Sequence, residues 1–337
     1  MQEKINRVLW ICIPILLVGA IVFGMIQRAK TRSYGMSGYY FDQDVKVTLY
    51  ENDEKKANRA LTQIEEIFET YQNLARTDRN NLESLYKINT SDETDMKLSK
   101  EMSDFLKYGK QWEKTSDGKI HLQLNDLMEM WESHFQDGSL PEEGELDTVQ
   151  IPSVDSMTVD DQNLHKKGTL FLNTSQYEIG YTLKQVDAYL KDQGMTRYII
   201  QVGSDTMVGD HYGEDGYKVA LASSTNGKIE RILSLTNQTM ITKGDYHEQV
   251  VLEDGKTYGT ILDPTTKYPF EKVRSVTVFS KDPLLADTIA SILYQMDVEE
   301  GRRYIKDYDD VEVIWTTLDG KVETTSKIAD WTKEEKG

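Results

Sequence analysis

The chain has 337 residues, of which 57 are acidic and 39 are basic, and its formal net charge at pH 7 is −18. This balance excludes nucleic-acid binding through a basic patch that neutralises phosphates, and it disfavours contact with anionic lipid surfaces. The length indicates one large domain or two modest ones.

The amino-terminal end carries a long apolar segment. Residues 8–26 contain no charged side chain, and basic residues flank the segment on both sides. About 20 helical residues span the core of a bilayer, so we expect residues 1–27 to be a retained membrane anchor. A short stalk is expected at 28–38. A cleavable signal peptide is the alternative, although no A-x-A-like cleavage site follows the segment.

The orientation of this anchor stays open on the residues alone. Two basic residues precede the segment and three follow it, so the positive-inside rule decides little. The single cysteine, Cys12, lies within the segment. A body without cysteine suits an oxidising compartment and also permits a reducing one.

The next part of the chain mixes strand and helix patterns. Residues 44–50, DVKVTLY, place apolar side chains at every second position, which predicts a strand. Apolar side chains at helical spacing predict helices at 54–75, 99–115 and 122–135. Residues 137–168 are rich in Asp, Glu, Ser and Gly, and we expect mostly an acidic surface connection there, with room for one short strand.

Short strands dominate the second half. A helix is predicted at 180–193, because Gly194 stands at the usual C-terminal stop position. Strands are predicted at 169–173, 198–202, 219–222, 231–235, 239–242, 273–279 and 311–317. Since no regular βαβ alternation or internal repeat occurs, we predict an α+β fold, with a single large mixed α/β domain at 39–325 and a polar tail at 326–337.

One further predicted helix carries two oxygen-bearing side chains on one face. It begins near Asp282 and Pro283 and places Asp287 and Ser291 one turn apart. Oxygen ligands of this kind suit hard cations such as Mg²⁺, which usually also keeps waters and binds substrate phosphates. Taken alone, the pair is equally typical of a solvated helix face or a cap.

Several other segments carry informative residues in a fixed order. They are FDQDVKVTLY at 41–50, LESLYKIN at 82–89, TSDGKIHLQLNDLMEMW at 115–131, GSD at 203–205, TKGDY at 242–246 and DPTTKYP at 263–269. Together with ADTIAS at 286–291, they resemble the ordered motifs of the FAD:protein FMN transferases, the ApbE flavin transferases. The resemblance covers roughly residues 39–306 and implies the fold of the flavin transferase type, here behind one N-terminal transmembrane helix.

The chain departs from the family pattern at several positions. The family's histidine before Ile-x-Asp-Pro falls on Thr260. The family's Asp-x-Gly-Gly-x-x-Lys-Gly segment falls on NTSQYEIG, with Asn173 in place of Asp and Ile179 in place of Lys. In TKGDY, Lys243 stands where the family has serine. Threonine cannot act as a general base near neutral pH, whereas histidine can, and His247 is an alternative base close to that segment.

The resemblance implies Mg²⁺-dependent transfer of FMN from FAD to a threonine. It implies that Asp287, Ser291 and the backbone carbonyl of Gln176 hold the metal. Thr260 and Asp263 are the residues expected at the catalytic centre. The residues expected to line the flavin or adenine site are Phe41, Tyr86, Lys119, Ile120, His121, Asn173, Ile179, Gly203, Asp205, Thr260 and Ile261.

The resemblance also implies the partners. They are FAD, a threonine-bearing target flavoprotein of a membrane or exported redox system, and the membrane through the N-terminal helix, but no nucleic acid. The resemblance favours a single-pass protein with its body outside the cytoplasm. The substituted positions keep a second hypothesis open, a catalytically impaired flavin-binding or assembly module. A third is an anchored surface domain that binds no flavin.

Overall fold

The computed structural model describes the chain except for residues 1–31, 79–82, 212–215, 245, 247–248 and 332–337. The apolar segment at 8–26, predicted to be an anchor, and His247 therefore lie outside the described residues. Within the part that is described, no helix combines the length and the apolar character needed to cross a bilayer.

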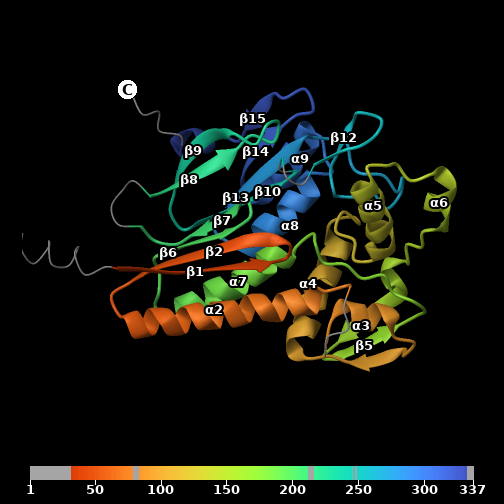
Figure 1. The fold of residues 1–337 in the computed structure, drawn as a ribbon, viewed down its shortest axis with the longest axis horizontal. Coiled ribbons are helices and arrows are strands. Elements are labelled where there is room, and N and C mark those ends of the chain that lie inside the picture. The colour runs from red at the N-terminus through yellow and green to blue at the C-terminus, as the bar shows by residue number, and fades with distance from the viewer. Residues whose placement is uncertain (1–31, 79–82, 212–215, 245, 247–248, 332–337) are drawn as a thin grey trace, which may run out of the picture.

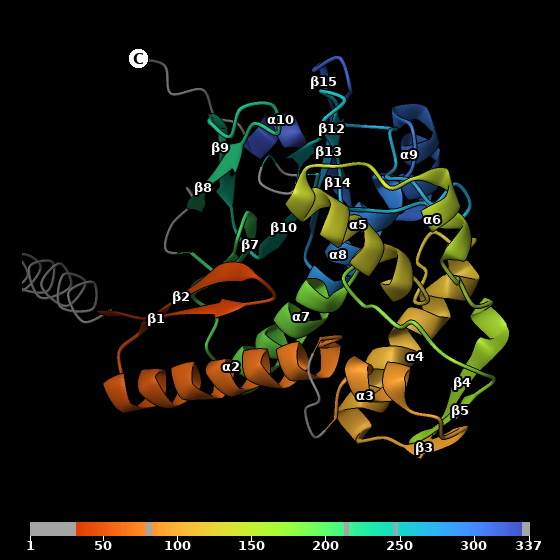
Figure 2. The same ribbon diagram turned by 45° about the vertical axis from the view of Figure 1, so that its right-hand side comes forward.

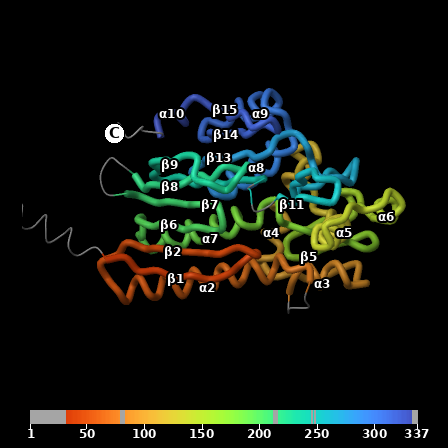
Figure 3. The backbone as a smooth tube through the Cα atoms, turned by 45° about the horizontal axis from the view of Figure 1, so that its top comes forward, coloured from red at the N-terminus to blue at the C-terminus, as the bar shows by residue number. Residues whose placement is uncertain are grey.

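An antiparallel sheet forms the centre of the described structure (Figure 1). Its strand order is β1-β2-β6-β7-β10-β13-β14-β15, and every pairing along it is antiparallel. The strands are β1 (Arg32–Tyr40), β2 (Gln43–Glu51), β6 (Tyr198–Val202), β7 (Asp205–Val208), β10 (Gln238–Lys243), β13 (Ser275–Ser280), β14 (Glu312–Thr316) and β15 (Val322–Thr324). Figure 3 shows the sheet running from red β1 and β2 at one edge to blue β14 and β15 at the other. Helices and antiparallel strands in one mixed domain confirm the predicted α+β class.

Three helices cover one face of this sheet. They are α2 (Glu54–Ala75), α7 (Glu178–Asp192) and α8 (Pro283–Leu293). The apolar side chains of α2 recur every three or four residues, which gives the helix one buried stripe. Its N-cap Asp53 accepts hydrogen bonds from the amides of Lys55 and Lys56, which fixes where the helix begins.

A hairpin and a short helix cover the other face. They are β8 (Tyr217–Ala222), β9 (Ile229–Leu235) and α10 (Ile328–Trp331), and they enclose a second apolar core with Met240, Phe279 and Ile314 of the sheet. Because both faces are covered, β10 and β13 are buried along their whole length. This burial explains why β10, QTMITK, shows no polar and apolar alternation in the sequence.

Smaller elements gather at one end of the molecule, away from β8 and β9 (Figure 2). They are α3 (Leu85–Thr90), α4 (Lys100–Thr115), α5 (Asn125–Asp137), α6 (Glu143–Thr148), and a three-stranded sheet of β3 (Asp95–Lys97), β4 (Met157–Asp160) and β5 (Asn163–Lys166). The remaining elements are η1 (Val154–Ser156), β11 (Val250–Val251), β12 (Thr257–Tyr258), α9 (Val298–Tyr304) and η3 (Ile305–Asp307).

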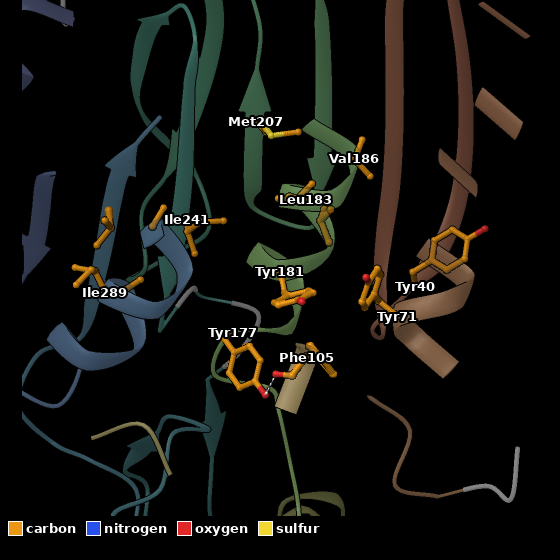
Figure 4. Close-up of a cluster of buried hydrophobic side chains, with 14 of the residues drawn as sticks. Tyr40, Tyr71, Phe105, Tyr177, Tyr181, Leu183, Val186, Met207, Ile241 and Ile289 are labelled. Atoms are coloured by element: carbon orange, nitrogen blue, oxygen red, sulfur yellow. Dashed lines mark hydrogen bonds between the residues drawn. The ribbon is translucent and has the colours of Figure 1, made fainter. Parts of the chain in front are cut away.

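An aromatic cluster connects α4, in the group of smaller elements, to α2 and α7 on the main sheet (Figure 4). The ring of Phe105 on α4 lies 5.2 Å from that of Tyr177 and 5.0 Å from that of Tyr181 between centroids. Tyr71 on α2 packs against Tyr181 at 5.3 Å. The hydroxyl of Tyr177 donates a hydrogen bond to the carbonyl of Phe105 at 3.1 Å. These contacts fix the amino-terminal end of α7, where the candidate site begins.

Two predicted boundaries are wrong. The stalk expected at 28–38 is largely strand β1, which pairs with β2 along its whole length. Its glycines suggested a linker, but a Cβ on Gly35 would lie 2.9 Å from the carbonyl oxygen of Val47, so this glycine permits a close strand approach. The tail expected at 326–337 contains helix α10, whose Ile328 is buried in the second core.

The middle region also differs from the prediction. Residues 137–168, expected to be mostly an acidic connection, contain α6, η1 and the β4–β5 hairpin. Residues 169–173, predicted to be a strand, form no regular element. Short elements in this region are fixed by contacts with α4 and β3, which a local pattern does not report. By contrast, the predicted helix at 54–75 and the predicted strand at 198–202 are confirmed to the residue.

Candidate functional site

The candidate site begins at helix α8. Asp282 caps this helix by accepting hydrogen bonds from the amides of Leu284 and Leu285, and Pro283 occupies the first turn, where its missing amide hydrogen costs nothing. The cap fixes where the helix begins and therefore which of its residues face α7. Asp287 and Ser291 consequently lie one turn apart on the face that packs on α7, and both are fully buried.

Gly180 on α7 lets the two helices approach closely. A Cβ at this position would lie 2.4 Å from the Cβ of Asp287 and 2.6 Å from the carbonyl oxygen of Pro283. The Gly180 amide donates a 2.7 Å hydrogen bond to Oδ2 of Asp287. Gly180 belongs to the first turn of α7, whose amides have no partner within the helix, so this carboxylate satisfies one of them and also meets the positive end of the helix dipole.

Lys243, the last residue of β10, forms an ion pair with the same carboxylate. Its Nζ lies 2.8 Å from Oδ1 of Asp287, and the side chains are 9% and 0% exposed. The strand ends at this point because Gly244 turns the chain with φ of 76°, where a Cβ would strike the carbonyl oxygen of Arg274 at 2.3 Å. Asp287 is therefore held by α7 on one oxygen and by β10 on the other.

The other two groups expected to bind metal are in contact with each other. The hydroxyl of Ser291 donates a 2.7 Å hydrogen bond to the backbone carbonyl of Gln176. The side chain of Gln176 bonds the backbone of Lys119 and His121 through its amide nitrogen and oxygen, at 3.0 and 2.8 Å. Asp287, Ser291 and the Gln176 carbonyl thus come together from two segments, as the resemblance implies.

These groups do not fit a divalent ion in the arrangement described. Mg²⁺ takes about six oxygen ligands at about 2.1 Å, whereas here both Asp287 oxygens and the Ser291 hydroxyl are engaged with protein partners. Two unit charges about 4 Å apart repel by about 4 kcal/mol at an effective dielectric constant of about 20, and a divalent ion beside the Lys243 ammonium doubles this cost. Nor do the described residues contain three or more His, Cys, Asp or Glu side chains placed to hold a metal.

A pocket of about 160 Å³ opens beside this cluster. Lys243, Gln176, Glu178 and Ser291 contribute polar groups to its lining, and most of the remaining lining residues are apolar. The complete lining is Phe41, Gln43, Leu124, Met128, Ser175, Gln176, Glu178, Ile179, Lys243, Thr260, Ile261, Leu262 and Ser291. Phe41, Gln176, Ile179, Thr260, Ile261 and Ser291 are the residues singled out from the sequence that this pocket brings together.

The pocket also contains residues that the sequence did not single out. Glu178 accepts a 2.7 Å hydrogen bond from the Thr174 hydroxyl. Burial raises the pKa of Glu178 to about 7, although that hydrogen bond and the charge of Lys243 oppose the shift. Glu178 stands at an unspecified position of the family segment, directly before Ile179, whereas Lys243 replaces a serine in TKGDY. Neither residue could be given a role without its spatial neighbours.

The loop that carries Thr260 places the two expected catalytic residues differently. The side chain of Thr260 is exposed at the pocket. Asp263 lies outside the pocket lining, and its Oδ1 accepts a hydrogen bond from the Thr265 amide at 2.8 Å, which is a turn-forming contact. Lys267 has a φ of 62°, which explains why the resembling motif has glycine there.

Other expected binding residues have structural contacts and lie outside this pocket. Gly203 turns β6 into β7 with φ of 54°, and Asp205 is buried and accepts a hydrogen bond from the Thr242 amide at 2.8 Å. Ile120 is fully buried in the main core, and Tyr86 lies on α3. These positions shape the framework that surrounds the pocket.

Three polar residues expected at the binding site form a second layer behind Gln176. Lys119 offers its carbonyl to Gln176 and to Gln295. Burial lowers the pKa of His121, whose Nδ1 accepts a hydrogen bond from the Gln123 amide. The backbone amide of Asn173 donates a hydrogen bond to the carbonyl of Leu122. Direct contact with a ligand remains a prediction for all three.

Comparison with known proteins connects this geometry to a family. Residues 41–315 match the model of the ApbE family. Among curated relatives, an FAD:protein FMN transferase of Klebsiella pneumoniae (strain 342) is 22% identical over 298 residues, covering 86% of this chain and 90% of the relative. One of Vibrio cholerae serotype O1 is 26% identical over 195 residues, covering 55% of this chain and 58% of the relative.

Solved structures show the same fold. The ApbE protein of Thermotoga maritima has a TM-score of 0.79 at 17% identity, covering 90% of this chain and all of the other. The flavin transferase ApbE of Vibrio cholerae has a TM-score of 0.74 at 22% identity, covering 89% of this chain and 99% of the other. At these identities the likeness concerns the fold and leaves the chemistry of the site to its residues.

Proposed function

The chain belongs to the ApbE family, and from this premise we propose that it transfers FMN from FAD to a hydroxyl group of a partner protein. Curated relatives that match most of the chain carry the name FAD:protein FMN transferase. The single observation that carries the proposal is the pocket itself, because residues from three separate resembling segments, Phe41, Met128 and Ser291, line one cavity.

The reaction is a phosphoryl-type transfer without any redox change. We propose that the hydroxyl oxygen of a threonine attacks the phosphorus of the FMN half of FAD. A new oxygen–phosphorus bond forms, the bond from this phosphorus to the bridging oxygen breaks, and AMP leaves with that oxygen. The hydroxyl proton passes to a base or to solvent, and FMN stays on the threonine as a phosphoester.

The two sides of the pocket suit the two parts of this substrate. Phe41, Ile179, Ile261 and Leu262 offer apolar surface for a flavin or adenine ring. The Lys243 ammonium lies on the polar side, where it can meet a phosphate oxygen. Catalysis of such transfers depends mainly on positioning and on stabilising negative charge, so a fixed cation is the feature to expect.

The magnesium dependence implied by the resemblance is not part of this proposal and is tested separately. When bound, such an ion neutralises phosphate charge during transfer. Asp287, Ser291 and the Gln176 carbonyl are the groups that would hold it, yet all of them have protein partners here. For this reason no step above passes through the metal, and the test below varies Mg²⁺ independently of FAD.

A second function is favoured by a specific observation. Thr260 lines the pocket at the position of the family's histidine and supplies no base. This substitution suits a flavin-binding or assembly module that keeps the fold without turnover. Such a module would retain FAD and leave it intact.

The test is incubation of the purified full-length chain in detergent with FAD and a threonine-bearing peptide from a flavinylated protein. Release of AMP and a mass gain equal to FMN on the peptide are the expected result, with and without Mg²⁺ compared in parallel. FAD that is retained without AMP or adduct identifies the binding module, and absence of any FAD binding contradicts both functions.

A matched pair of variants connects the result to the pocket. Ile261→Ala removes part of the apolar wall and should weaken FAD binding about tenfold, because a few methylenes in an apolar pocket are worth about 1–3 kcal/mol. Val251→Ala removes an aliphatic side chain that is exposed outside the pocket and should change nothing. Equal effects of the two changes would place the FAD site elsewhere.

We further propose that residues 1–27 anchor the chain in a membrane with the body outside the cytoplasm, where a threonine-bearing redox protein is its acceptor. The support is the uncharged segment at 8–26 and the family resemblance. Alkaline carbonate extraction of membranes should leave the full chain in the pellet and release a version that lacks residues 1–27. Protease added to intact cells should degrade the body, and protection of the body would reverse the orientation.

A further inference from the structure

A lysine pairs with the carboxylate among the groups that were expected to bind metal. The Lys243 ammonium lies 2.8 Å from Oδ1 of Asp287, while Oδ2 accepts the Gly180 amide at 2.7 Å. Only 7% of Lys243 and none of Asp287 is exposed. The carboxylate thus meets one full positive charge at Oδ1, as an ion pair without hydrogen-bond geometry, and one helix-end amide at Oδ2.

Burial keeps this pair together. Breaking a buried ion pair by removing one partner is strongly unfavourable, because the remaining charge is left in a medium that solvates it poorly. A divalent ion that bound Oδ1 would have to displace the ammonium and meet this cost. Lysine and a metal therefore compete for one carboxylate, and the lysine is covalently part of the site.

The position of Lys243 also faces the proposed substrate. Lys243 lines the same pocket as Gln176, Ser291 and Thr260, so its charge borders the cavity as well as Asp287. An ammonium carries three N–H donors, which lets it contact a carboxylate and a phosphate oxygen at the same time. With the substrate bound, the lysine ammonium would stand between the Asp287 carboxylate and a phosphate oxygen. A metal ion otherwise provides this arrangement.

We propose that the ammonium of Lys243, tethered by Asp287, takes the place of the divalent cation, so that this site receives the pyrophosphate of a dinucleotide without any metal. The inference rests on the proposed function for the identity of the ligand as FAD. The ammonium neutralises charge on the phosphate oxygens and exchanges no atoms with the substrate. The ammonium binds the ligand, and Asp287 positions the ammonium.

Manganese binding tests this directly, because Mn²⁺ occupies magnesium sites and its electron paramagnetic resonance signal reports the bound fraction. The full-length wild-type chain should bind no Mn²⁺ at this site, so that Asp287→Asn leaves its Mn²⁺ titration unchanged. Lys243→Ser restores the hydroxyl found in the resembling motif and should gain one Mn²⁺ with at least tenfold tighter affinity. The double change of Lys243→Ser with Asp287→Asn should abolish that gain.

A surface pair supplies the matched control. Lys184 and Asp282 also lie 2.8 Å apart and also join α7 to the start of α8, but both side chains are substantially exposed and line no part of the pocket. Lys184→Ser should therefore leave Mn²⁺ binding as in the wild type. Circular dichroism melting curves establish that each variant is folded before its titration is interpreted.

Three results would overturn the inference. The first is a wild-type chain that binds one Mn²⁺ and loses it in Asp287→Asn, which needs no lysine variant to fold. The second is a folded Lys243→Ser chain that gains no Mn²⁺. The third is AMP release by the wild type that falls more than about twofold in EDTA and returns with Mg²⁺. If AMP is never released under any condition, the proposed function fails, while the Mn²⁺ titrations still decide the inference.

Discussion

Gly180 is the residue on which the geometry of the site most depends. Its missing side chain allows α7 and α8 to meet, and its amide holds the Asp287 carboxylate. The identity of this residue follows from packing: a methyl group would overlap two atoms of the neighbouring helix. The glycine is therefore explained by contact across the helix pair, since its own backbone is ordinary helix.

Gly180→Ala should destabilise the protein by about 1–3 kcal/mol, because overpacking a close helix contact forces both helices apart. Urea denaturation followed by circular dichroism measures the change. Gly144→Ala is the matched control, since a Cβ there meets nothing within 4 Å and the residue lies in helix α6. It should be neutral or slightly stabilising. Equal destabilisation by both changes would contradict the packing argument.

At the scale of elements, the junction between β2 and α2 shows how local charges fix a boundary. Glu51 ends β2, accepts the Asn52 amide at 2.6 Å and pairs with Lys56 at 3.2 Å. Burial acts to raise the pKa of Glu51, but the hydrogen bonds from Asn52 and Lys56 outweigh it and hold the pKa below its usual value. The strand end and the helix start are therefore joined by one carboxylate.

The lowered pKa of Glu51 determines in which direction its contribution to folding stability changes with pH. Because the folded state holds the charged form of Glu51, its contribution is complete above the unfolded-state pKa and is lost as pH falls through the folded-state pKa. Glu51→Gln should cost up to about 1 kcal/mol at pH 7, and the difference from wild type should vanish in strong acid. Unfolding midpoints at both pH values measure this. Glu65→Gln, on the exposed side of α2, should show no such convergence.

Among the described residues, the sheet has one apolar core on each face, and a third apolar cluster surrounds Trp131 of α5. The helical face carries the main core, and β8, β9 and α10 close the second. In this second core α10 places Ile328 beside Phe279 and Ile314 of the sheet. The carboxy-terminal residues therefore belong to the folded body as far as Trp331, which the polar composition of that segment did not indicate.

Ile328→Ala should lower the free energy of unfolding by about 2–4 kcal/mol, the usual cost of a cavity in a packed core. Ile229→Ala removes the same side chain from a position on β9 that is 67% exposed, and should stay within about 0.5 kcal/mol of the wild type. Both are measured by urea denaturation. A small effect of Ile328→Ala would mean that α10 unfolds separately from the rest.

An element could be predicted from the sequence where the interactions that form it are close together in the chain. The helix at 54–75 was predicted to the residue because its apolar period is a local signal. The acidic stretch at 137–168 was misjudged because β4 and β5 are held by pairing with each other and with β3. At the site, Asp287 and Ser291 were found from their helical spacing, whereas Glu178 and Lys243 were not assigned a role.

By itself the sequence determined the family, the α+β class and the residues that meet around Gln176, since these depend on ordered motifs and local periodicity. Only the tertiary structure decided what binds Asp287. The Lys243 ammonium comes from strand β10, 44 residues before Asp287 in the chain, and no local pattern reports such a distant contact. An ion pair is fixed by distance in space and by the exclusion of water, and both arise only when the helices close on the sheet.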